Sequence, residues 1–345
     1  MENENLADRY QNWKETIELQ VVETEKRKQL LGAEHPDTLR SMTTLAATYR
    51  SHGCWKEAEA LQVMVLEKRK QVLGEEHLDT LASMADLAST YRNHGCWNEA
   101  ESLQMVMMEG RKRLFGNEHP DTLTSMADLA ATYSNQGRWK EAEALQVAVM
   151  EKISHLLGNE HPDTLRSMEN LAATYRNEGR WKEGEALHVV MMEKRKRLLG
   201  DEHPDTLVSM ANLANTYRQQ GRWTEAEALQ VVVVEKRKQV LGEDHPDALM
   251  SMADLAATYS NQGHWKEAEA LQVVVMEKMN QVLGDDHPFT LTSMADLANT
   301  YRKQERWTEA DALEMVVMEK RKRVLGDDHP ETLASMANLV GTNRD

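Results

Sequence analysis

Apolar residues recur in this chain at the three- and four-residue spacing of an amphipathic helix. With successive residues placed about 100° apart, Met42, Leu45, Ala46 and Tyr49 fall on one stripe. A second helical segment begins near Trp55 and runs to about residue 73. Because each helix has one apolar stripe, the pattern predicts two helices that bury these stripes against each other and against the next pair.

The same pair of helices repeats along the whole chain with a period of 42 residues. Two independent markers carry this period, one tryptophan and one histidine in each repeat. The tryptophans are Trp13, Trp55, Trp97, Trp139, Trp181, Trp223, Trp265 and Trp307. The histidines are His35, His77, His119, His161, His203, His245, His287 and His329. A fixed period of this length indicates a repeat array.

Local signals set the expected ends of the helices. Pro36 suits the first turn of a helix, where its missing N–H costs nothing, and Asp37 places negative charge at the positive end of the helix dipole. Gly53 is expected just after the first helix and Gly74 just after the second. The first helix is therefore predicted from about residue 36 to 52, and the second from about 55 to 73.

The spacing Ala46-x2-Tyr49-x3-Gly53-x-Trp55-x2-Ala58 resembles the signature of tetratricopeptide (TPR) repeats. The added LGEEHPDT-like residues make the unit similar to the longer repeats of kinesin light chains and of STAND/NLR-type signalling proteins. This resemblance implies an all-α, right-handed α–α superhelical solenoid of TPR-like helix pairs that recognises proteins. The heptad coiled coil of kinesin light chains and the phosphate-binding loop of STAND proteins have no counterpart in the sequence.

The absence of a linker or low-complexity segment favours one continuous array over residues 1–345. A partial repeat is expected at residues 1–34, full repeats beginning at residues 35, 77, 119, 161, 203, 245 and 287, and a half repeat at 329–345. In the half repeat, Met336 and Leu339 would have no second helix to cover them. Two explanations stay open: the chain is part of a longer protein, or end-to-end contacts between copies cover this face.

The charge of the chain limits its partners. The formal net charge is −16 and the pI is about 5.3, which disfavours binding to nucleic acid or to an anionic membrane. No apolar run is long enough to span a bilayer, and the first residues lack the pattern of a secretory signal. Two cysteines are too few for a disulfide framework, so a reduced, cytoplasmic protein is expected.

Four positions of the first helix vary between repeats and share one face, opposite the apolar stripe. In the repeat that begins at residue 35 they are residues 40, 44, 47 and 51, which we expect to line the concave surface. The equivalents of Thr44 are Asp86, Asp128, Asn170, Asn212, Asp254, Asp296 and Asn338. The other candidate residues are Asn215, Asn299, Asn93, Asn135, Asn177, Asn261 and the adjacent arginines Arg50, Arg92, Arg176, Arg218 and Arg302.

The chemistry of these residues suits the binding of a peptide. Asparagine offers both donors and acceptors to a peptide backbone, and arginine offers a fork of donors to carboxylates. The resemblance to kinesin light chains implies that Asn170, Asn212 and Asn338 hold an extended peptide. The four aspartates depart from that pattern and argue against a preference for acidic peptides. The alternative is that all of these residues are solvated polar positions without a ligand.

Several recurring residues invite other interpretations. The eight repeat histidines could suggest a metal, but a capping or loop role is favoured, because stacked equivalents lie too far apart to share one ion. The His52-x-Cys54 and His94-x-Cys96 pairs are the best metal candidates, but their spacing and exposure argue against a site. The tryptophans are expected in the core. A row of apolar residues on the second helices is expected to be buried between repeats or, failing that, to mediate self-association. Its members are Val22, Met64, Val106, Ala148, Val190, Val232, Val274 and Val316.

No catalytic motif or cofactor-binding motif occurs in the chain, so a non-enzymatic protein without a cofactor or metal is expected. The favoured function is a scaffold or sensor array that binds a protein or an extended peptide in its concave groove. A kinesin-light-chain-like cargo adaptor and a self-assembling structural array remain the alternatives.

Overall fold

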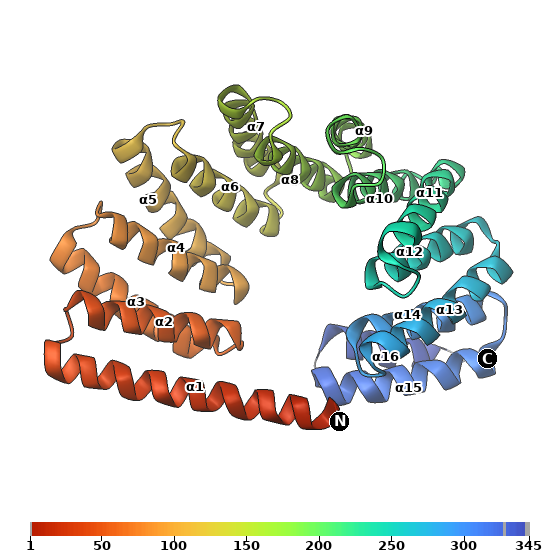
Figure 1. Ribbon diagram of the computed structural model, residues 1–345, viewed down its shortest axis with the longest axis horizontal. Helices are drawn as coiled ribbons and strands as arrows, with labels where there is room; N and C mark the ends of the chain where they lie inside the picture. The colour runs from red at the N-terminus through yellow and green to blue at the C-terminus, as the bar shows by residue number, and fades with distance from the viewer. Residues whose placement is uncertain (1, 327–328, 342–345) are drawn as a thin grey trace. The chain divides into compact units, whose positions relative to one another are not determined.

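The computed structural model describes residues 2–326 and 329–341, without the side chains of residues 2–13, 325, 330, 340 and 341. Trp13 and the outermost residues of the two partial repeats therefore lie outside the described side chains. Within these ranges the chain forms sixteen helices and no strand, which confirms the all-α class (Figure 1). Two compact units are distinguished, residues 1–174 and 175–345, and the boundary falls within helix α8. The prediction of one continuous array stays a prediction.

The helices alternate between a shorter first helix and a longer second helix, as the period predicts. The first helices are α2 (Pro36–Ser51), α4 (Leu78–Asn93), α6 (Pro120–Asn135), α8 (Pro162–Glu178), α10 (Pro204–Gln219), α12 (Pro246–Gln262), α14 (Pro288–Lys303) and α16 (Pro330–Gly341). The second helices are α3 (Trp55–Leu73), α5 (Trp97–Phe115), α7 (Trp139–Leu157), α9 (Trp181–Leu199), α11 (Trp223–Leu241), α13 (Trp265–Leu283) and α15 (Trp307–Leu325). A single 30-residue helix, α1 (Glu2–Leu31), precedes them.

The repeat histidines cap the first helices, which confirms their predicted role. In each repeat the histidine Nδ1 accepts the backbone N–H of the residue two positions later, for example His203 from Asp205 at 3.2 Å. The same bond occurs at His35, His77, His119, His161, His245, His287 and His329. It satisfies one of the N–H groups that a helix start leaves without a partner.

The apolar stripe of the first helix forms the core, as predicted. Met42 and Leu45 are each 4% exposed, and Ala46 is fully buried. Ala58 on the second helix is also fully buried, so two small side chains lie where the helices meet. Second helices contact the first helices on either side of them, for example α3 with α2 and α4 in the first unit, and α11 with α10 and α12 in the second. Burial of the stripe therefore requires neighbouring repeats.

Glycine closes the second helices in a conformation that other residues avoid. Gly242, for example, has φ 95° and ψ 158°. At the end of the first helices a left-handed residue is needed, and Gly263 supplies it with φ 82° and ψ 9°. The equivalent residue in the next repeat is Glu305, the one described non-glycine residue with positive φ, at 61°. Its side chain makes this left-handed turn unfavourable.

Two predictions about burial are wrong. Trp223, Trp265 and Trp307 are 40–52% exposed and the other described tryptophans are half-buried, because each begins a second helix at its exposed end. The row on the second helices is also not buried between repeats: Val22, Met64, Val106, Val190, Val274 and Val316 are 37–51% exposed, and Ala148 and Val232 are half-buried. None of the described helices is long and apolar enough to cross a membrane.

Candidate functional site

The candidate residues of the first helices lie at the surface, and none of them is buried. We call this set, defined above by its sequence positions, the polar face. Its most exposed members are Asn93, Asn135, Asn177, Asn261, Asn170, Asn299, Asp296, Asn338 and Arg176. Half-buried members are Asp86, Asp128, Asn212, Asp254, Asn215, Arg50, Arg92, Arg218 and Arg302. The first helix thus presents this face outward while the opposite stripe lies in the core.

Part of the polar face links one repeat to the next. Three arginines near the ends of first helices lie close to an aspartate on the first helix of the following repeat. The pairs are Arg50–Asp86 at 4.0 Å, Arg92–Asp128 at 3.5 Å and Arg218–Asp254 at 3.8 Å. These arginines and aspartates therefore have a structural role in joining neighbouring repeats.

The environment of Asp86 and of Asp254 raises the pKa of each carboxyl group. Burial raises the pKa of Asp254, although Arg218 and Arg237 lower it in part. Burial likewise raises the pKa of Asp86 against the influence of Arg50 and Arg69. Desolvation therefore outweighs the neighbouring positive charge at these sites.

One pair is built differently. Arg302 is followed in the next repeat by Asn338 instead of an aspartate, and its Nη2 lies 3.3 Å from an oxygen of Glu314. The Asn338 amide donates to the other oxygen of Glu314 at 3.4 Å. Glu314 is fully buried, and Gln230 is the equivalent residue beside the Arg218–Asp254 pair. At this pair the carboxylate that faces the arginine thus belongs to a buried residue of the second helix instead of a residue of the polar face.

The structure brings some candidate residues together around two hollows. Asp296, Asn299, Arg302 and Asn338 line an open pocket of about 550 Å³, which also contains Trp307. Asp128 and Asn170 line a separate pocket of about 340 Å³. Arg218 donates a hydrogen bond to Asn215 at 3.2 Å. The asparagines Asn93, Asn135, Asn177 and Asn261 lie at the C-terminal ends of their helices and line neither of these two pockets.

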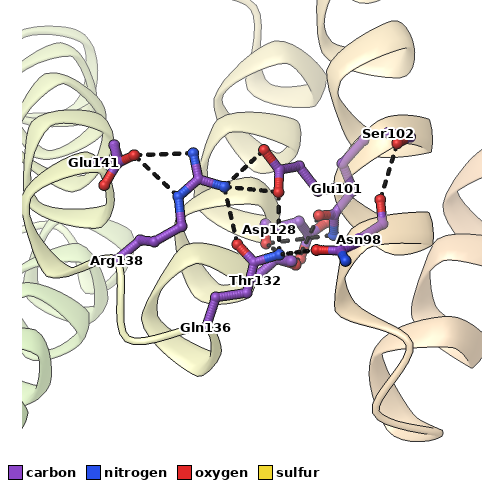
Figure 2. Close-up of polar contacts among 9 residues, drawn as sticks. Asn98, Glu101, Ser102, Asp128, Thr132, Gln136, Arg138 and Glu141 are labelled. Atoms are coloured by element: carbon purple, nitrogen blue, oxygen red, sulfur yellow. Dashed lines mark hydrogen bonds and ion pairs between the residues drawn. The ribbon is translucent and has the colours of Figure 1, made fainter.

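A second polar contact between repeats, which we call the turn clamp, was not predicted from the sequence. Figure 2 shows it in the first unit: Arg138 donates from Nη1 to both oxygens of Glu101 at 2.7 and 2.8 Å. Arg138 also binds Glu141, and its guanidinium lies 4.1 Å from the ring centroid of Tyr133. Gln136 donates to Glu101 at 3.0 Å. The turn between two helices is thereby tied to the second helix of the preceding repeat.

The turn clamp recurs in the second unit. Arg222 binds Glu185 at 2.8 Å, and Arg306 binds Glu269 at 2.7 Å. Cys54 and Cys96 occupy the arginine position in two turns of the first unit, where each is half-buried. The signal in the sequence was the arginine directly before tryptophan together with a glutamate 37 residues earlier.

The turn clamp also perturbs its carboxylates. Partial burial pushes the pKa of Glu101 upward, but hydrogen bonds from Arg138 and Gln136 outweigh this effect and lower the pKa. The same balance lowers the pKa of Glu185 and of Glu269. Since a partly exposed ion pair contributes little by itself, the value of the clamp lies in the several hydrogen bonds that Glu101 accepts from Arg138 and Gln136 and in the contact of Arg138 with the ring of Tyr133.

The described residues hold no group of three or more His, Cys, Asp or Glu side chains placed to bind a metal ion. The His-x-Cys pairs remain local: Cys96 Sγ lies 3.9 Å from His94 Nδ1 within the same turn. The expectation that the chain uses no metal or cofactor stays a prediction.

Comparison with known families identifies the repeat. A family model described as tetratricopeptide repeat matches seven consecutive 42-residue segments, from residue 38 to residue 331. The chain belongs to the tetratricopeptide repeat family. The matched segments begin three residues after the start that we assigned from the histidines and have the same period. Repeats of this family generally bind proteins or peptides, so the chain is a protein-interaction scaffold in this general sense.

Solved structures support the same assignment. TPR-like repeats of a putative kinesin light chain from Podosopora anserina are 31% identical, with a TM-score of 0.56 over 60% of this chain and 98% of that chain. A STAND protein with a tetratricopeptide repeat sensor from Pyrococcus horikoshii is 15% identical, with a TM-score of 0.61 over 88% of this chain and 44% of that chain. The quorum sensor NprR from B. thuringiensis is 12% identical, with a TM-score of 0.52 over 99% of both chains. The latter two show the fold alone. No curated protein sequence matches the chain.

Proposed function

We propose that this protein is a non-catalytic scaffold or sensor array that binds an extended peptide or protein segment along the polar face. The observation that carries the proposal is the division of the first helix. Its apolar stripe is buried, whereas every candidate residue on the opposite side is exposed or half-buried. Donors and acceptors that recur on one surface can form hydrogen bonds with the backbone amides of an extended chain.

The arginine–aspartate pairs indicate which residues of the polar face would contribute least to binding. Where Arg and Asp pair across repeats, their charges largely cancel, so these positions add little net attraction for a charged ligand. Asn170 and the asparagines at the helix ends are exposed, namely Asn93, Asn135, Asn177 and Asn261. We therefore infer that Asn170, which is exposed, contributes most to the grip on a peptide backbone, together with the half-buried Asn212. Two of the similar structures are described as a putative kinesin light chain and as a quorum sensor, and these descriptions are compatible with the proposal.

The test replaces two asparagines of the polar face. Peptides are selected from a displayed random library on the unmodified protein, and their affinities are then measured for the Asn170→Ala/Asn212→Ala variant. We expect the double variant to bind the peptides at least about tenfold more weakly, because each substitution removes up to two hydrogen bonds to the peptide. Asn280→Ala, on an exposed position of a second helix, serves as the control. Unchanged affinity in the double variant would show that the polar face is not the binding surface.

Self-association is a second candidate function, and a specific observation favours it. The exposed row on the second helices repeats one apolar side chain per helix pair over most of the chain. Rows of this kind can pair with another apolar surface, including a second copy. Light scattering over a range of concentrations tests this: a strict monomer at high concentration argues against self-association, through either the row or the ends.

A further inference from the structure

Five of the second helices carry an arginine that bonds to the first helix of the next repeat. In α3, Arg69 donates from Nη1 to Ser83 Oγ at 2.7 Å and to the carbonyl oxygen of Asp79 at 3.0 Å, both on α4. The arrangement recurs with Arg111, Arg195, Arg237 and Arg321, each bonded to the serine 14 residues later at 2.6–2.9 Å. The arginine thus joins a second helix to the first helix of the next repeat.

Helix α7 departs from this pattern, because Ile153 stands at the arginine position. The serine that an arginine would contact, Ser167, donates instead to the carbonyl of Thr164 within its own helix. Ile153 lines a pocket of about 340 Å³ between α6, α7 and α8, entirely within the first unit.

Two other repeats also lack the bond. In α1 the equivalent Arg27 binds Glu23, and Ser41 donates to the carbonyl of Thr38. In α13 the equivalent residue is Met279, which is 2% exposed and packed in a core cluster.

The pocket has an apolar floor and a polar rim. Val149 and Leu123 are buried at its base, while Leu156 and Leu157 are 44% and 49% exposed. The rim contains Asp128 and Asn170 from the polar face, so the pocket opens on the surface that we propose as the binding face. This volume is at the lower end of the range for ligand pockets and suits one large side chain.

The charges at the rim favour an uncharged occupant. Asp128 lies 3.5 Å from Arg92, and Asp163 lies 2.8 Å from Arg166. Both carboxylates are therefore neutralised by an arginine, and the floor offers no charged partner to an incoming side chain. Burial of a charged group there would be costly, whereas an apolar group gains from leaving water.

We propose that the pocket lined by Ile153 is an anchor site for one leucine- or phenylalanine-sized side chain of an uncharged, extended peptide. This inference rests on the proposed function, because Asn170 would hold the backbone next to the anchored side chain. The array would then bind along a repeated face but fix the register of its ligand at one point, where the arginine is absent.

The chain contains only two isoleucines, Ile17 and Ile153, which makes the test direct. With ¹³C-labelled isoleucine methyl groups, Ile153 reports on the pocket and the buried Ile17 is an internal reference. The probes are capped peptides Ac-Ser-Gly-X-Gly-Ser-NH2 in which X is Phe, Leu, Ala, Glu or Lys. We expect the Phe and Leu peptides to shift the Ile153 signal alone and to bind at least about tenfold more tightly than the Ala peptide.

Ile153→Arg should refill the pocket as in the other repeats, restore a bond to Ser167 and reduce binding of the Phe peptide at least about tenfold. Met279→Arg makes the same change in the second unit and should leave binding unaltered. Because a variant could misfold, Arg111→Ile offers the converse test: it should open an equivalent pocket and add a second site for the Phe peptide. Equal affinity for all five peptides, or an Ile153 signal that no peptide shifts, overturns the anchor.

The anchor and the proposed function can fail separately. If library-selected peptides lose affinity in the Asn170→Ala/Asn212→Ala variant but not in Ile153→Arg, the polar face binds peptides and the anchor is wrong. If neither variant affects their binding, both proposals are wrong.

Discussion

The buried carboxylate of Glu314 gives a prediction about how charge is shared between repeats. Glu314→Gln keeps an oxygen for the Asn338 amide but removes the negative charge that faces Arg302. Arg302 has a side chain that is only 15% exposed, so water replaces the lost carboxylate poorly. Breaking a fully buried pair costs roughly 3–5 kcal/mol, and the partial exposure of Arg302 together with the remaining amide reduces this to about 2 kcal/mol.

The internal repeats show how the loss should be repaired. Beside Arg218 the equivalent positions hold Gln230 and Asp254, so the carboxylate comes from the next repeat. Asn338→Asp in the Glu314→Gln background recreates that arrangement at the last described pair. We expect this double variant to recover more than half of the lost stability, which corresponds to a coupling of about 1 kcal/mol or more between the two substitutions.

Local hydrogen exchange is the appropriate assay, because a repeat array need not unfold as a single two-state unit. Amides of α14 and α15 should exchange faster in Glu314→Gln and return toward the original rate in the double variant, while α10 and α11 stay unchanged. The reciprocal change, Gln230→Glu with Asp254→Asn, should be better tolerated than either single substitution. The reasoning is refuted if Glu314→Gln exchanges like the unmodified protein, or if Asn338→Asp gives no recovery.

Three further predictions concern turns and helix ends. Glu305→Gly should raise the free energy of unfolding by about 1 kcal/mol, because glycine adopts the left-handed conformation without strain. His203→Ala should lower it by about 1 kcal/mol through loss of the bond from the Asp205 N–H, whereas His203→Asn should retain most of the cap. Arg138→Gln should remove the influence that lowers the pKa of Glu101. Because the pKa of Glu101 is lower in the folded protein than its unfolded value of about 4.3, the resulting stabilisation is fully present above that pH and is lost as the pH falls below it. The difference in stability between the unmodified protein and Arg138→Gln should therefore decrease at low pH.

Local hydrogen exchange of the helices that flank each substitution measures all three effects, with the last one compared at pH 6 and at pH 3.5. A loss of stability in Glu305→Gly would contradict the assignment of strain to that turn. Equal stability of the alanine and asparagine variants at His203 would show that the histidine does not act as a cap. A difference between Arg138→Gln and the unmodified protein that stays constant with pH would mean that Glu101 does not carry the effect.

The sequence was most informative where one residue type has a single local role. Proline, aspartate and glycine fix where helices begin and end, and the predicted limits around Pro36, Gly53, Trp55 and Gly74 agree with the structure to within a residue or two. These residues act through their own backbone, so their effect does not depend on distant contacts.

The sequence was least informative where burial depends on neighbouring repeats. A tryptophan at a fixed period indicates an important position, but the period does not say how deep the ring lies, and Trp307 is 52% exposed. The turn clamp between Arg138 and Glu101 joins residues 37 positions apart. Helical periodicity within one segment cannot reveal such a pair, because it depends on how one repeat stacks on the next.

Comparison between repeats could have revealed more, since substitutions in this array are correlated. Arg50 and Arg92 are each followed one repeat later by an aspartate, whereas Ser134 is followed by Asn170. Arg302 is followed by Asn338, and there the carboxylate appears at Glu314. Arg176, which is followed by Asn212, and Asp296, which follows Ser260, do not obey this rule.

These correlations help to separate structural from functional positions. A residue that changes together with its neighbour in the next repeat is constrained by stacking, as the arginine–aspartate pairs are. Where one residue differs from its equivalents in the other repeats and its contact partner does not, the contact between the two is lost in that repeat. Ile153 is such a residue, since Ser167 remains without the arginine that bonds the equivalent serine in five other repeats. Met279 is another, but its side chain is packed in the core. Of these two substitutions, Ile153 is the one that combines a lost contact with an apolar pocket beside Asn170, where we propose the anchor.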